Sequence, residues 1–214
     1  MIAGPRVLRV NPADCTAADL APAVAWLRDG GIVAIPTDTV YGLAVDIRSV
    51  LAVRRLFALK GRPARAALPL IAASIAQVVA CTGRLDAREA ALASAFWPGP
   101  LSLVRDAPAW VVPEVHGGHR TLAMRVPDHL VARRMCDAWG EALSATSANI
   151  SGAPPADRAE ALGALADDPH VLVIDAGVTP GGLPSTLVDV RAARPVLLRE
   201  GAIPWSRVLE FVHG

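Results

Sequence analysis

Three short polar segments contain the side chains that are best suited to chemistry. Pro36–Leu43 carries two threonine hydroxyls and a carboxylate, Lys60–Arg62 carries two cations two residues apart, and Ser144–Gly152 carries four hydroxyls and an amide. Arginine offers a planar fork of donors and lysine a compact point charge, so the second segment could hold phosphate oxygens. Small residues and hydroxyls in the third segment would let a ligand approach the backbone.

Each polar segment also has a purely structural interpretation. Asp38 is a turn former, a cation at the end of a helix stabilises the helix dipole, and a run of hydroxyls is typical of a surface loop. The bias among the basic residues favours a functional role for the second segment, because the chain has 20 arginines and a single lysine, Lys60. A helix end explains a cation at this position but does not explain why it is lysine.

The motifs that are missing narrow the chemistry further. The sequence contains neither of the phosphate-binding motifs G-x-x-x-x-G-K-[ST] and G-x-G-x-x-G, and no nucleophile–base pair is apparent. His116 and His119 lie in a Gly-rich loop without a clear third ligand, so no metal site built from protein side chains is identified. We therefore expect catalysis by positioning and electrostatics, as in phosphoryl or nucleotidyl transfer.

Composition excludes several classes of protein. The 214 residues carry a formal charge of +1 and are 53% hydrophobic, which argues against disorder and against a simple, strongly basic nucleic-acid binder. Residues 47–85 hold seven cations and no acid, and the sequence leaves open whether they attract a polyanion or are neutralised by acids elsewhere. Three cysteines without a C-x-x-C pair, no signal peptide and no spanning segment predict a cytoplasmic protein without membrane contact.

Helical and strand-like segments alternate along the chain, and these elements must position the polar segments. The expected helices cover residues 16–29, 49–59, 74–81, 86–96, 128–139, 157–166 and 204–212. The expected strands cover residues 32–35, 68–72, 101–104, 121–126, 142–145, 171–174, 187–190 and 196–198. This pattern predicts an α/β fold, one domain over residues 1–214, with a twisted mixed sheet and helices on both of its faces. Ligands of open α/β sheets bind outside the carboxyl ends of strands, so the polar segments should meet in one crevice.

Taken together and in order, these segments resemble the YrdC-like family of threonylcarbamoyl-AMP synthases. Residues 31–43 are similar to the opening motif of the family, and Lys60–Arg62 and Ser147–Asn149 are similar to its K-x-R and S-x-N pairs. Residues 97–101, 125–127 and 185–189 are similar to further family segments in the same order. The resemblance covers about residues 20–201 and is to the short bacterial form, without the additional C-terminal domain of longer members.

The resemblance implies a reaction and its partners. L-threonine, bicarbonate and ATP would give threonylcarbamoyl-AMP and pyrophosphate, with Mg²⁺ accompanying ATP. The product would pass to a threonylcarbamoyl-transferase complex that modifies adenosine 37 of tRNA, and direct contact with RNA is left open. The family also implies a single YrdC-like domain with a concave basic cleft.

The resemblance also assigns roles to individual residues. The tetrad expected to be catalytic and to hold the ATP phosphates is Lys60, Arg62, Ser147 and Asn149. Further residues expected in the nucleotide site are Thr146 and Arg199. The residues expected around L-threonine are Thr37, Thr39, Tyr41, Arg125 and Ser185.

Two positions depart from the family pattern. Many relatives carry Lys-Pro-Leu where this chain has Leu68–Leu70, and some have a histidine where Ala73 stands. These departures leave open a paralogue that adenylates another carbamate. The seven cations of residues 47–85 leave open an RNA-binding or ribosome-maturation module that uses a basic cleft without catalysis.

Overall fold

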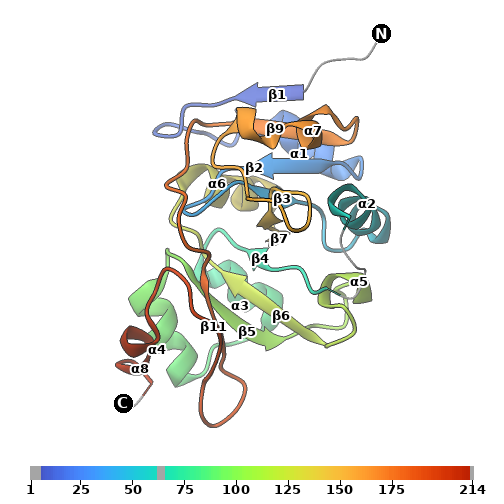
Figure 1. Ribbon diagram of the computed structural model, residues 1–214. Coiled ribbons are helices and arrows are strands. Elements are labelled where there is room, and N and C mark those ends of the chain that lie inside the picture. Colours follow the sequence, from blue (N-terminus) through green and yellow to red (C-terminus); the bar gives the residue numbers. More distant parts are fainter. Residues whose placement is uncertain (1–5, 62–65, 213–214) are drawn as a thin grey trace.

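Two mixed β-sheets form the framework of the protein in the computed structural model, which describes residues 6–61 and 66–212 (Figure 1). The strand order is β1-β9-β2-β3-β8 in the five-stranded sheet and β11-β10-β5-β6-β4-β7 in the six-stranded sheet. Both sheets combine parallel and antiparallel pairs. The predicted mixed α/β class is confirmed, although the strands divide between two sheets where the sequence predicted one.

The two sheets draw their strands from distant parts of the chain. The five-stranded sheet contains β1 (Arg6–Arg9), β2 (Ile32–Ile35), β3 (Gly42–Ala44), β8 (Thr146–Ser147) and β9 (Val171–Asp175). The six-stranded sheet contains β4 (Leu70–Ile71), β5 (Leu101–Asp106), β6 (Thr121–Arg125), β7 (Leu143–Ser144), β10 (Thr186–Asp189) and β11 (Val196–Arg199). The first sheet occupies the upper part of Figure 1 and the second the lower part.

Helices connect and cover the strands. They are α1 (Ala21–Arg28), α2 (Val50–Lys60), α3 (Ile75–Thr82), α4 (Ala87–Phe96), α5 (Pro113–His116), α6 (Leu130–Trp139), η1 (Ala159–Leu162), α7 (Ala164–Asp167) and α8 (Trp205–Leu209). Ser49 caps α2, because its side chain accepts a hydrogen bond from the Ala52 amide. In the part of the chain that the structure describes, no helix combines the length and the hydrophobicity that crossing a membrane requires.

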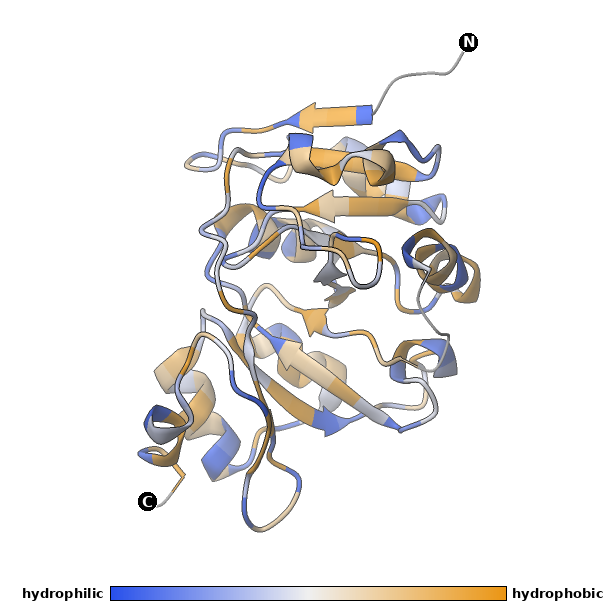
Figure 2. Cartoon of the chain, in the orientation of Figure 1, coloured by the Kyte–Doolittle hydropathy of each residue, from blue (hydrophilic) through white to orange (hydrophobic). Residues whose placement is uncertain are grey.

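Buried apolar strands form the core between these helices. All four residues of β2 are buried, as expected for a strand that is covered on both of its faces. Figure 2 shows hydrophobic residues along β2, β9 and β5, with hydrophilic residues in many of the connecting turns. The continuous apolar runs in the sequence therefore mark the centres of both sheets correctly.

Some predicted boundaries are wrong for identifiable reasons. The helix expected over residues 157–166 breaks into η1 and α7 at Gly163, which has φ of +51°. The helix expected over residues 16–29 begins only at Ala21, because residues 17–20 form turns in which the amides of Leu20 and Ala21 donate to carbonyls three residues earlier. The strands β1, β3 and β8 and the short helix α5 were not predicted.

The segment around Ala145 links the two sheets. Just before Ala145, β7 pairs with β4 of the six-stranded sheet, and just after it β8 pairs with β3 of the five-stranded sheet. The Ala145 amide donates a hydrogen bond to the carbonyl of Pro69, which fixes the crossing point. The polar segment that follows is therefore held where the two sheets face each other.

Candidate active site

A pocket of about 370 Å³ lies between the two sheets. Its walls include Gly42 and Thr146 from the five-stranded sheet and Ala123 and Leu187 from the six-stranded sheet. Eight of the eleven predicted site residues line it: Thr37, Thr39, Tyr41, Arg125, Thr146, Ser147, Ser185 and Arg199. The structure thus brings residues of the first and third polar segments together with two distant arginines, whereas Lys60 of the second segment is not among the described lining residues.

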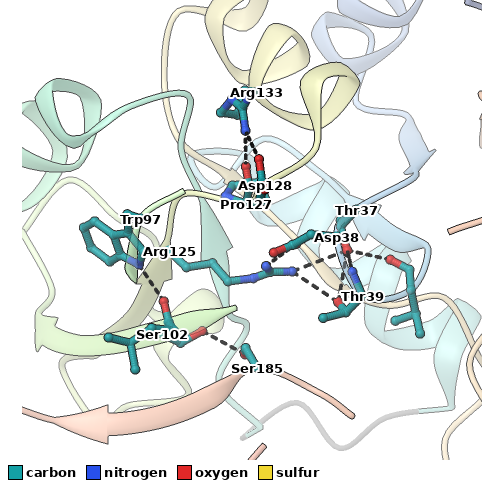
Figure 3. A network of polar contacts seen from close by, with 12 residues as sticks. Thr37, Asp38, Thr39, Trp97, Ser102, Arg125, Pro127, Asp128, Arg133 and Ser185 are labelled. Atoms are coloured by element: carbon teal, nitrogen blue, oxygen red, sulfur yellow. Dashed lines mark hydrogen bonds and ion pairs between the residues drawn. The ribbon is translucent and has the colours of Figure 1, made fainter. Parts of the chain in front are cut away.

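Arg125 crosses from one sheet to the other. It ends β6 in the six-stranded sheet, and its Nη1 donates to Oδ1 of Asp38, which follows β2 in the five-stranded sheet. Its Nη2 lies 3.4 Å from the hydroxyl of Thr37 and 3.3 Å from that of Thr39. Figure 3 shows Arg125 extended toward this loop. A cation and two hydroxyls therefore meet on one side of the pocket, where the resemblance places L-threonine.

Proton directions in this loop leave Thr39 able to accept a ligand hydrogen bond. The Thr37 hydroxyl donates to the Val40 carbonyl at 2.7 Å, so the 3.1 Å contact between the two threonine hydroxyls requires Thr39 to be the donor. The Thr39 oxygen then has only acceptor capacity remaining, part of which Arg125 occupies. A hydroxyl or amine of a ligand would suit this position.

Ser185 and Arg199 form a further polar part of the pocket wall. The Ser185 hydroxyl lies 2.9 Å from that of Ser102, and Arg199 Nη2 donates to the Ser185 carbonyl at 2.8 Å. Desolvation and the nearby charge of Arg125 lower the pKa of Arg199. The pocket is therefore flanked by two cations, an arrangement that suits an anionic ligand.

Tyr41 contributes its ring to the pocket while its hydroxyl is engaged elsewhere. The side chain is fully buried, and its hydroxyl donates to the carbonyl of Gly177 at 2.9 Å. Burial raises the pKa of Tyr41 to about 12, so the hydroxyl stays protonated and keeps this bond. Tyr41 lines the side of the pocket that was predicted for L-threonine, with its hydroxyl fixing the 176–177 turn.

Lys60 lies behind the pocket, beneath the third polar segment. It is the last residue of α2, which ends at Gly61 in the left-handed conformation, and it is only 3% exposed. Its Nζ donates to the carbonyls of Ser147 and Asn149, the latter at 2.7 Å, and to Asn149 Oδ1 at 3.1 Å. The Ser147 hydroxyl donates to the same Oδ1 at 2.6 Å. Three members of the predicted tetrad therefore form one network, and the fourth, Arg62, lies outside the described residues.

The two departures from the family pattern have different positions. Leu68 lines the pocket and gives it an apolar wall where many relatives carry a cation. Ala73 is not among the described lining residues, and its amide donates to the side-chain oxygen of Gln77. Only the first departure therefore changes the chemistry of the pocket wall in this structure.

Two polar residues at the site were missing from the predicted set. The sequence leaves open whether Asp38 is a functional carboxylate or a turn former, and Ser102 lies inside a strand-like run. One sequence signal could have identified both residues. They lie in or beside strands predicted to be buried, and a buried polar group needs a hydrogen-bond or ion-pair partner. The partners, Arg125 and Ser185, lie more than 80 residues away in sequence, which local spacing does not reveal.

The seven-cation segment is partly neutralised by acids from outside it. Arg48 Nη2 lies 2.5 Å from Glu141 Oε1, and Arg54 Nη2 lies 2.8 Å from Glu114 Oε1. Arg55 donates to the backbone carbonyl of Gly30. The structural interpretation of these three cations is therefore favoured over attraction of a polyanion.

His116, one of the two histidines considered above as metal ligands, serves the local backbone. His116 Nδ1 accepts hydrogen bonds from the amides of Gly118 and Arg120. Within residues 6–61 and 66–212, no group of three or more His, Cys, Asp or Glu side chains could hold a metal ion.

Comparison with known proteins finds relatives of the family that the sequence motifs resemble. Residues 25–201 match the Sua5/YciO/YrdC family model, whose description is "Telomere recombination". A threonylcarbamoyl-AMP synthase from Pyrococcus abyssi is 37% identical over 186 residues, which cover 87% of this chain and 55% of that protein. A threonylcarbamoyl-AMP synthase from Thiobacillus denitrificans is 38% identical over 170 residues, which cover 79% of this chain and 90% of that protein.

A solved structure extends the similarity to three dimensions. The crystal structure of P. abyssi Sua5 complexed with L-threonine matches with a TM-score of 0.87 and 33% identity, covering 96% of this chain and 60% of that one. This chain thus spans little more than half the length of the P. abyssi protein.

Proposed function

Because the chain belongs to the Sua5/YciO/YrdC family, we propose that it is a threonylcarbamoyl-AMP synthase, a nucleotidyltransferase. One observation carries the proposal: the pocket between the sheets collects eight of the residues that the resemblance assigns to ATP and L-threonine. Its two arginines suit the anionic groups of both substrates, and its hydroxyls can bind the polar groups of threonine.

The reaction joins three substrates. The amine of L-threonine would combine with bicarbonate to form a carbamate and water. A carbamate oxygen would then attack the α-phosphorus of ATP, which forms threonylcarbamoyl-AMP as the bond to pyrophosphate breaks. Negative charge builds up on the leaving pyrophosphate, so fixed cations and donors provide most of the stabilisation.

The residues divide between the two halves of the pocket. On the threonine side we place the Thr37 and Thr39 hydroxyls, the ring of Tyr41, Arg125 and Ser185. On the nucleotide side we place Thr146, the Ser147–Asn149 loop and Arg199, with Lys60 holding the loop from behind. Mg²⁺ would enter with the ATP phosphates and neutralise part of their charge.

The product and the setting complete the proposal. Threonylcarbamoyl-AMP is a mixed anhydride, so it would be handed to a transferase that modifies adenosine 37 of tRNA. We place the reaction in the cytoplasm, where the buried thiols of Cys15, Cys81 and Cys136 would stay reduced.

Pyrophosphate release tests the proposal directly. Purified protein with ATP, Mg²⁺ and bicarbonate should release pyrophosphate only when L-threonine is added, and mass spectrometry should detect threonylcarbamoyl-AMP. Lys60→Arg should remove most of this activity in folded protein, since a planar guanidinium cannot replace an ammonium that meets three acceptors in a buried site.

Two outcomes would overturn parts of the proposal. A folded protein that releases no pyrophosphate with threonine is not this synthase. A panel of other amino acids tests the apolar wall at Leu68: faster turnover with another amino acid would favour a paralogue that adenylates a different carbamate.

A further inference from the structure

The ion pair between Arg125 and Asp38 is buried at the edge of the pocket. The exposed fractions of the two side chains are 9% and 8%. Arg125 lines the pocket, whereas Asp38 is not among the described lining residues and pairs with the arginine. An effect of Asp38 on a ligand is therefore expected to act through Arg125.

The guanidinium of Arg125 keeps donors in reserve. Nη1 carries two hydrogens, one of which goes to Asp38, and Nη2 makes two long contacts with the Thr37 and Thr39 hydroxyls. The Nε hydrogen and the second Nη1 hydrogen have no hydrogen-bond partner among the described residues. A planar fork with unused donors at a pocket wall can hold a carboxylate with two parallel bonds, provided that its plane is fixed.

Asp38 supplies the only strong contact that fixes this plane among the described residues. The hydroxyl contacts at 3.3 and 3.4 Å are too long to do so alone. The other carboxylate oxygen, Oδ2, is buried without a hydrogen-bond partner, as is Nδ1 of the nearby His129. An orphan buried polar atom costs stability, and Nη1 of Arg105 is a second example away from the pocket. At Asp38 this cost falls beside an arginine whose unused donors line the pocket, which favours a functional role.

We infer that Asp38 is a positioning residue, which holds Arg125 in the orientation that receives the carboxylate of the amino-acid substrate. The inference rests on the proposed function for the identity of that substrate. The effect of Asp38 should be confined to the amino-acid side, because the Ser147–Asn149 loop that would hold ATP is fixed by Lys60.

The molecule provides a matched control in a second buried ion pair. Arg105 of β5 pairs with Glu89 of α4, and their side chains are 7% and 10% exposed. Neither residue lines the pocket among the described residues. Glu89→Gln therefore removes a buried carboxylate charge of similar exposure without touching Arg125.

Calorimetry and arginine-side-chain NMR separate positioning from general loss of structure. In Asp38→Asn, the Kd for L-threonine should rise about 10- to 100-fold, the range that one charge-assisted hydrogen bond supplies. The Kd for ATP should change less than about threefold, and Asp38→Glu should recover part of the threonine affinity. In ¹⁵N spectra, the hindered guanidinium rotation of Arg125 should become free in Asp38→Asn and stay hindered in Glu89→Gln.

The two readouts distinguish failure of this inference from failure of the proposed function. Hindered rotation of Arg125 in Asp38→Asn overturns the positioning role whatever the wild type binds. Equal weakening of threonine and ATP binding, or an equal effect of Glu89→Gln, also overturns it. If the wild-type protein does not bind L-threonine, the proposed function fails, and the Arg125 spectra still decide what Asp38 does.

Discussion

The two buried arginine–carboxylate pairs, Arg125–Asp38 and Arg105–Glu89, have almost the same exposure and very different surroundings. Around Arg105, Nε donates to the Thr82 hydroxyl, and Nη2 donates to carbonyls at the end of α3, including that of Arg84 at 2.9 Å. The other oxygen of Glu89 accepts from the Asp86 amide in a capping box. Protein groups thus surround this pair on both sides.

Each pair contains one buried atom without a hydrogen-bond partner, Nη1 of Arg105 and Oδ2 of Asp38, but only the pocket pair keeps unused donors at a pocket wall. Arg125 keeps unused donors, and Asp38 keeps a buried oxygen without a hydrogen-bond partner. Burial and charge are alike in the two pairs, so neither property marks the functional one. The distinguishing feature is the hydrogen-bonding capacity that the protein leaves unfilled at a pocket wall.

The largest expected effect comes from breaking the Arg105–Glu89 pair, which lies away from the pocket. Arg105→Met should lower the free energy of unfolding by about 3–5 kcal/mol, because it leaves the Glu89 charge buried and unpaired and removes the donors at the end of α3. Urea unfolding measures the change. The kcat/KM of the folded fraction should stay within about twofold of wild type, and a selective loss of activity would contradict the comparison.

Breaking the pocket pair should have the opposite signature. Arg125→Met should lower kcat/KM for L-threonine about 100-fold, equivalent to about 2.7 kcal/mol, since it removes a charged fork from the substrate. The free energy of unfolding should fall less than in Arg105→Met, because Asp38 lies next to a pocket into which water can enter. Steady-state kinetics and urea unfolding of the same preparation provide both numbers. An Arg125→Met protein that is as unstable as Arg105→Met would erase the distinction.

The sequence predicted much of the fold and most of the pocket wall, for physical reasons. The apolar run Ile32–Ile35 predicts β2 with its observed bounds, because a continuous apolar run indicates a buried strand without any knowledge of the strands that pair with it. β3 and β8 are too short for their pattern to be distinguished from loops, and they exist because they pair with each other and with β2. Non-local pairing of this kind has no signature within a short window.

The same limit applies to the site. Lys60 is predicted to be functional because it is the only lysine. Its three acceptors lie in the segment that follows the crossing between the sheets at Ala145, and the sequence does not predict that crossing. The sequence leaves the role of Asp38 open because its partner Arg125 is 87 residues away. Residue types were predictable, whereas the partners that decide between a direct and an indirect role were not.

A smaller effect on stability is expected at acidic pH from His129, which lies near the pocket pair. Burial lowers the pKa of His129, against the opposing charge of Asp38, with Arg133 and Asp128 also nearby. The unfolded chain therefore takes up the proton at a higher pH than the folded protein, so stability should fall as pH drops below about 6.5. In thermal unfolding at about pH 7.5 and pH 5.5, His129→Gln should lose fewer degrees than wild type, by no more than about 2–4 °C.

The sign of this pH effect sharpens the comparison. Glu89→Gln should keep the full wild-type sensitivity of stability to acid that is due to His129, because the Arg105–Glu89 pair belongs to a different part of the fold. Parallel loss of stability in wild type and His129→Gln would show that the acid sensitivity arises elsewhere.

The smallest effect is expected at a surface pair, which sets the baseline for both buried ones. Arg48 and Glu141 are 2.5 Å apart with side chains 53% and 36% exposed, and the Arg48 guanidinium lies 4.8 Å from the centre of the Trp110 ring. Glu141→Gln should change the free energy of unfolding by only about 0–1 kcal/mol, because water screens exposed ion pairs and the ring still holds the arginine. The difference should shrink further in 1 M salt during urea unfolding. A loss as large as that of Arg105→Met would mean that exposure does not rank these pairs, and the contrast between the two buried pairs would then lose its reference point.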